Sequence, residues 1–125
     1  MKVALLSSEE SQPDFLEMLK AKMETKIADL EFSIIKARKN LDIPKKLSKI
    51  EGFDIVVVVI LYSSESMELK TVLEKLIDID IEGIEIIKML EKTEPVEDMS
   101  EKEAMQLKNE LTAKAEEILT GEILK

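Results

Sequence analysis

The chain has 125 residues, 45% of them apolar, which is enough for one domain (residues 1–125) with one hydrophobic core. Its 27 Asp and Glu outnumber its 18 Lys and Arg, and the net charge of −9 disfavours binding to nucleic acid or to anionic membranes. The absence of Cys and His excludes disulfides, Cys–zinc sites and Ser-His-Asp or Cys-His triads. The longest apolar run, Ile55–Tyr62, is too short to cross a bilayer, and no signal peptide opens the chain. We therefore expect a soluble, cytoplasmic protein.

Strand and helix patterns alternate in the N-terminal half. The first predicted strand is the apolar run Lys2–Leu6, followed by an amphipathic helix of about four turns that Ser11 caps. Residues 30–34 alternate between apolar and polar, which indicates an edge strand. A short helix begins at Asp42-Ile43-Pro44, and Gly52 closes it in the left-handed conformation.

The C-terminal half continues the alternation. Residues 54–62 (DIVVVVILY) are apolar on both faces, as a central parallel strand must be. A helix follows with an apolar stripe from Leu69 to Ile77, and Gly83 closes the turn after it. Residues 84–90 form the fourth predicted strand.

The last segment is predicted to be a loop and a helix. Residues 91–99 are acidic and contain a proline, which indicates a loop. Residues 100–103 (SEKE) form a capping box that opens the last helix. Its apolar stripe extends to Ile118, and Gly121 is expected to end it.

This βαβαβαβα order predicts an α/β fold with a doubly wound, four-stranded parallel sheet and right-handed crossovers. The third strand is the most buried and the second has a polar face, which gives the flavodoxin-like strand order 2-1-3-4. The switch point then lies between the first and third strands. Ligands of such sheets bind beyond the carboxyl ends of the strands, near that crevice.

The loops that flank the predicted switch point are rich in hydroxyl groups. Serines at a helix N-terminus can bind an anion, although capping the helix is their commoner role. Arg38 is the only arginine and can hold a phosphate or carboxylate with two hydrogen bonds, or form a surface ion pair. Tyr62 can stack on a planar ligand or simply pack at the strand end. The candidate ligand-binding residues are Ser7, Ser8, Ser11, Arg38, Tyr62, Ser63, Ser64 and Ser66.

The sequence predicts no metal and no cofactor. Glu9, Glu10 and Asp14 offer oxygen ligands for Mg²⁺, but favourable placement near a helix N-terminus explains them more simply. The three glycines lie outside the candidate loops, so no Rossmann or P-loop phosphate fingerprint is present. The acidic residues at 94–98 lack the ligand spacing of an EF-hand.

Three segments are similar to parts of one known family: KVALLS at 2–7, the stretch at 34–61, and KNELTAKAEEIL at 108–119. They resemble 6,7-dimethyl-8-ribityllumazine synthase and its relative, the archaeal riboflavin synthase. The stretch at 34–61 resembles the family's second strand, its arginine-bearing loop, a Pro-opened helix with paired lysines, and the "DIV" strand. The segment at 108–119 resembles the last helix of the archaeal enzyme.

The resemblance implies a homo-oligomer like the family's pentamer, with sites between subunits and a pteridine-like ligand. The resemblance also implies that Arg38 and the hydroxyl-rich loops correspond to residues of the family's substrate pocket. The family's catalytic histidine has no counterpart, and SSESMELK at 63–70 replaces the Gly-rich stretch that shapes the family's pocket. Three functions therefore stay open: a reduced synthase that binds a pteridine- or flavin-like ligand (a riboflavin-biosynthesis transferase if catalytic), an inactive oligomeric scaffold, or a flavodoxin-like ligand-sensing module.

Overall fold

The computed structural model describes residues 1–125 and has four strands that alternate with four helices. In chain order the elements are β1 (Lys2–Ser8), α1 (Leu16–Lys26), β2 (Glu31–Ala37), the 3-10 turn η1 (Asn40–Asp42), α2 (Ile43–Ser48), β3 (Ile55–Tyr62), α3 (Met67–Asp78), β4 (Glu85–Lys92), the 3-10 turn η2 (Val96–Asp98) and α4 (Glu101–Ile123). All strands pair in parallel, in the order β2-β1-β3-β4. The predicted doubly wound α/β fold is confirmed.

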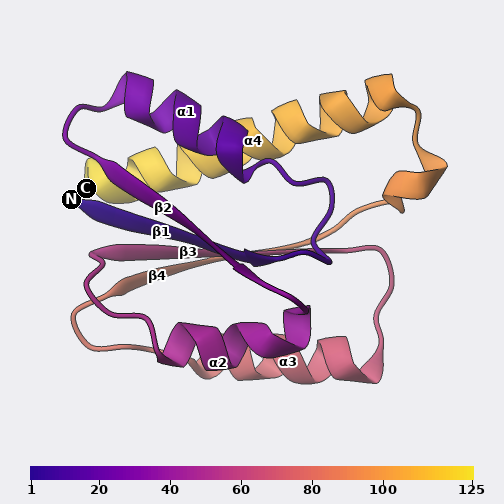
Figure 1. Cartoon of the computed structure of the whole chain (residues 1–125), viewed down its shortest axis with the longest axis horizontal. Coiled ribbons are helices and arrows are strands. Elements are labelled where there is room, and N and C mark those ends of the chain that lie inside the picture. Colours follow the sequence, from indigo (N-terminus) through magenta and orange to yellow (C-terminus); the bar gives the residue numbers. More distant parts are fainter.

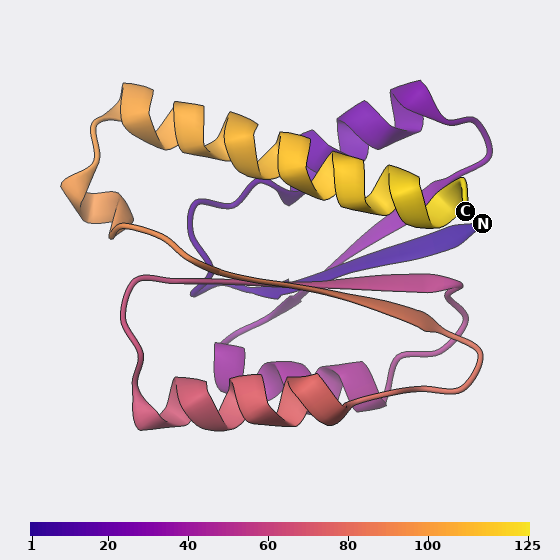
Figure 2. The same cartoon turned by 180° about the vertical axis from the view of Figure 1, so that it is seen from behind.

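The sheet separates two helical layers. Helices α1 and α4 cover one face, and α2 and α3 cover the other (Figures 1 and 2). Along β3, residues 55, 57, 59 and 61 face α1 and α4, while residues 56, 58 and 60 face α2 and α3. Because both faces are covered, β3 is apolar throughout, as predicted. None of the four helices has both the length and the apolar character needed to cross a membrane.

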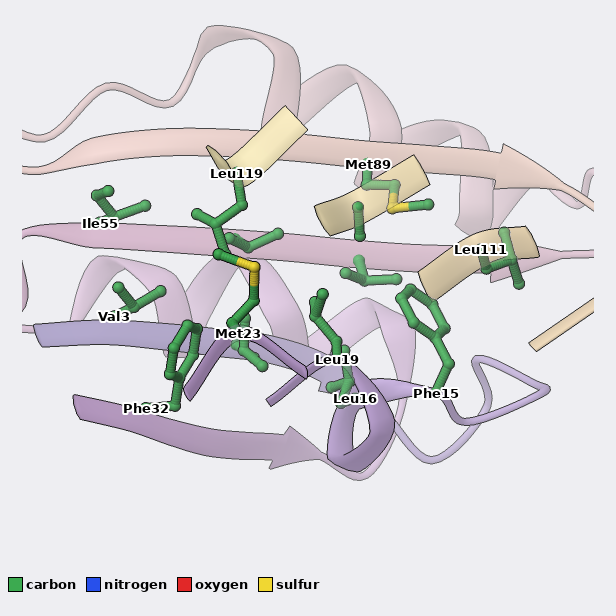
Figure 3. Close-up of a cluster of buried hydrophobic side chains, with 14 of the residues drawn as sticks. Val3, Phe15, Leu16, Leu19, Met23, Phe32, Ile55, Met89, Leu111 and Leu119 are labelled. Carbon is green, nitrogen blue, oxygen red and sulfur yellow. The ribbon is translucent and has the colours of Figure 1, made fainter. Parts of the chain in front are cut away.

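The core under α1 and α4 is built from apolar residues spaced by three and four positions. Leu16, Leu19 and Met23 of α1 meet Leu111 and Leu119 of α4 above the central strands (Figure 3). This spacing puts the apolar side chains of each helix on one face, which is why each helix docks in one rotational setting.

Local sequence signals fix several element ends. The Ser66 hydroxyl accepts a hydrogen bond from the Leu69 N–H at 3.0 Å, and the Ser100 hydroxyl accepts one from the Glu103 N–H at 3.1 Å. The predicted cap at Ser100 is therefore confirmed, and Ser66 is the serine that caps α3. Gly52 and Gly83 have φ of +83°, the left-handed conformation that glycine adopts without strain. The prediction that Gly52 closes the short helix is wrong, because α2 already ends at Ser48 with Lys49 as its C-cap residue.

Helix α1 begins later than predicted. It starts at Leu16, and its N-cap residue, Phe15, makes no side-chain capping hydrogen bond. The prediction that Ser11 caps this helix is wrong, because the Ser11 hydroxyl is hydrogen-bonded inside the fold instead.

Three further expectations about helices and strands are wrong in detail. Gly121 lies inside α4, which continues to Ile123, because a single glycine near a helix end costs only about 1 kcal/mol. Ile77 and Ile118 are 65% and 39% exposed, since the buried stripes run through neighbouring positions of α3 and α4. β2 and β4 extend to Ala37 and Lys92, because parallel pairing with β1 and β3 continues beyond the apolar runs.

Candidate functional site

The carboxyl ends of the strands lie at the right-hand edge of the sheet in Figure 1. The predicted switch point between β1 and β3 is at this edge. Three of the candidate serines, Ser7, Ser8 and Ser11, are buried there, each at most 2% exposed. Their hydroxyls are therefore closed to a ligand in this conformation.

Ser7 and Ser11 continue the contact between β1 and β3 with their side chains. The last paired residues of these two strands are Leu6 and Val58. Beyond them, the Ser7 hydroxyl donates to the Val59 carbonyl at 2.7 Å, and the Ser11 hydroxyl accepts from the Leu61 N–H at 3.1 Å. The two hydroxyls thus provide hydrogen-bond partners for buried backbone groups of β3 beyond the point where pairing with β1 ends.

Asn40, which was not among the candidate residues, ties the first loop to the turn after β2. Its side-chain oxygen accepts hydrogen bonds from Ser8 and, at 3.4 Å, from Ser11. Its backbone N–H donates to the Glu10 carboxylate at 2.6 Å. The only sequence signal for Asn40 is that Asn is common in turns, and its partners are about 30 positions away in the chain.

A cavity of about 300 Å³, the switch-point cavity, opens beside this network. It lies between the end of β3, the turn at residues 39–41 and the start of α3. Four candidate residues line it: Tyr62, Ser63, Ser64 and Ser66. The Ser66 hydroxyl already caps α3 by accepting a hydrogen bond from the Leu69 N–H. Tyr62 is half-buried, and Ser63 and Ser64 are exposed.

The charges around the switch-point cavity do not suit an anion. Glu10 and Glu68 line it against a single cation, Lys39. The sequence predicts that a small anionic ligand binds between the loops at residues 7–11 and 63–66, with Arg38 as a further contact. In the structure Arg38 is not part of this cavity.

Arg38 lies instead in a second hollow of about 580 Å³, which we call the basic basin. The basin lies at the carboxyl end of β2 and along α2, and its lining contains no apolar residue. It consists of Lys36, Arg38, Lys45, Lys46, Lys49, Glu9 and Asp42. The residues predicted to form one site are thus divided among the buried network, the switch-point cavity and the basic basin.

The acidic residues near β1 are held by different partners. Asp14 forms an ion pair with Lys36 at 2.8 Å and accepts a hydrogen bond from the Leu16 N–H. Glu10 binds the Asn40 N–H. No group of three or more acidic side chains is arranged to hold a metal ion.

Comparison with known proteins adds no relative. No protein-family model matches the chain, and no curated protein matches its sequence. The resemblance to the lumazine and riboflavin synthases therefore rests on the three similar segments alone.

Proposed function

We propose that the switch-point cavity binds a planar, pteridine-like heterocycle, and that the chain acts in the cytoplasm as a reduced relative of the lumazine and riboflavin synthases. The observation that carries this proposal is the position of Tyr62, the chain's only tyrosine, at the carboxyl end of the central strand on the wall of the cavity. Ligand pockets measure roughly 300–1,000 Å³, so this cavity suits a small ring system.

The residues that line the switch-point cavity suit an uncharged ligand that has ring N–H groups. Leu41 and Leu69 supply apolar walls, and Ser63 and Ser64 supply hydroxyls. The Glu10 and Glu68 carboxylates can accept hydrogen bonds from N–H donors, and they would repel a phosphate. We therefore expect lumazine and riboflavin to bind better than FMN.

We propose ligand binding as the function of a single chain; catalysis would require more than one chain. Riboflavin formation transfers a unit between two identical substrates, so positioning can carry much of the reaction. A cavity of about 300 Å³ accommodates one such ring system. Transfer would therefore need a second cavity, contributed by another subunit.

Replacing Tyr62 with Ser tests the proposed stacking. Stacking of a ring on an aromatic side chain contributes about 1–3 kcal/mol, so Tyr62→Ser should weaken lumazine binding by roughly tenfold or more. Tyr62→Phe should retain most of the affinity because the ring remains. The measurement is a fluorescence titration with lumazine, riboflavin and FMN, with circular dichroism to confirm that each variant is folded.

Met105→Ser, on the exposed surface of α4, is the matched control and should bind as the wild type does. Equal affinity for wild type and Tyr62→Ser would place any binding outside the cavity. If the wild type bound neither lumazine nor riboflavin, the ligand proposal would fail and the scaffold function would be favoured.

Self-assembly is a second expectation. β4 is an edge strand, and Ile86 and Ile87 on it are only partly buried. An open edge presents unpaired backbone groups that another chain can cover. We expect light scattering to give a multiple of the 14.2 kDa chain mass, with the pentamer of the similar family as the reference case. A monomer mass at high protein concentration would refute this expectation.

A further inference from the structure

The basic basin has the opposite charge to the protein as a whole. Five cations and two carboxylates line it, a formal charge of +3 in a chain whose net charge is −9. Such a concentration of one sign in a hollow raises the local concentration of oppositely charged ligands.

Contacts within the protein leave most of this charge uncompensated. Lys36 is paired with Asp14 at 2.8 Å. Arg38, Lys45, Lys46 and Lys49 are exposed and take part in none of the five ion pairs of the chain. The lysines of α2 are placed favourably near the C-terminal end of its dipole, but Arg38 lies outside that helix and has no such explanation.

We propose that the basic basin binds a compact ligand that carries two or more linked phosphates. Arg38 offers a planar guanidinium that can hold a phosphate with two hydrogen bonds. The lysines add point charges: Lys45 and Lys46 lie in the last turn of α2, and Lys49 is its C-cap residue. The lining has no apolar residue, so the charged phosphates carry the recognition and the rest of the ligand stays in solvent.

Size and charge favour a compact oligophosphate over a nucleic acid. Duplex DNA carries one charge per roughly 1.7 Å of its axis, so most of its phosphates would extend past the basin. The rest of the chain carries a net negative charge and would repel them. A chain of two or three phosphates can instead remain within the hollow of about 580 Å³.

The test is calorimetric titration of the full chain with tripolyphosphate, pyrophosphate and ADP at low ionic strength. Equal affinity for pyrophosphate and ADP would identify the phosphates as the recognised group, as proposed. The double variant Arg38→Gln/Lys46→Gln should bind tripolyphosphate at least roughly tenfold more weakly, since it removes two cations that can donate hydrogen bonds to the phosphates. Both positions are exposed, so the fold should be retained.

Lys70→Gln/Lys102→Gln removes the same charge from exposed positions on α3 and α4 and should leave tripolyphosphate binding unchanged. Equal weakening by both double variants, or no binding by the wild type, would overturn the proposal. Tighter binding of a single-stranded oligonucleotide than of tripolyphosphate would overturn it in favour of a nucleic-acid site. Tyr62→Ser should not alter tripolyphosphate binding, because Tyr62 lies in the other hollow.

Discussion

Replacing Val57 with Asp is expected to unfold the chain, or to lower its free energy of unfolding by about 3–5 kcal/mol. Val57 is 3% exposed on the central strand, between Leu5 of β1 and Ile87 of β4. Its side chain lies among apolar side chains in the core under α1 and α4. An aspartate there would have no cation to pair with and no water to solvate it.

Urea denaturation monitored by circular dichroism measures this effect. If Val57→Asp does not accumulate as folded protein, Val57→Thr gives the same information on a smaller scale. Threonine has nearly the same shape, and its buried hydroxyl should cost about 1–3 kcal/mol. Lys70→Asp on the exposed face of α3 is the control and should change stability by less than about 0.5 kcal/mol. A Val57→Asp protein with an unchanged melting temperature would show that Val57 is not buried.

Replacing Ser11 with Ala is expected to lower the free energy of unfolding by about 1–3 kcal/mol. The substitution removes the acceptor for the buried Leu61 N–H and a donor to the Asn40 side chain. The alanine methyl group fits the space, so the cost comes from polar groups left without partners. This result would show that Ser11 stabilises the fold at the switch point through its hydrogen bonds.

Ser48→Ala provides the comparison. The Ser48 hydroxyl also makes a hydrogen bond, to the Lys45 carbonyl at 2.7 Å, but in solvent, where water can replace it. We expect a change below about 0.5 kcal/mol. If Ser11→Ala were as stable as Ser48→Ala but bound lumazine more weakly, Ser11 would be a ligand contact, contrary to the structure.

The candidate ligand residues outside the buried network lie in two separate hollows, the switch-point cavity and the basic basin. Arg38 and the serines at 63–66 both follow strands at the same sheet edge, so the sequence placed them in one anion site. In the structure Arg38 lines the basic basin with Lys45, Lys46 and Lys49, while Ser63 and Ser64 share their cavity with Glu10 and Glu68. An uncharged heterocycle and an oligophosphate would therefore bind at different places.

The order of strands and helices, the strand order of the sheet and the two-sided core could be predicted from the amino-acid sequence. These features follow from local patterns: the doubly apolar run of β3, the helical spacing of Leu69, Val72 and Leu76, and the caps Ser66 and Ser100. Each pattern acts over a few neighbouring residues, so it can be recognised without knowledge of the rest of the fold.

The roles of the polar residues at the carboxyl edge of the sheet could not be predicted from the sequence. Ser7 and Ser11 find their partners on β3, 52 and 50 positions away, and Ser8 finds Asn40, 32 positions away. A hydroxyl has the same local signature whether it caps a helix, faces a ligand or satisfies a distant carbonyl. Its role is fixed only when the parallel crossovers bring β1, the turn after β2 and the end of β3 together, because hydrogen bonds reach only about 3 Å.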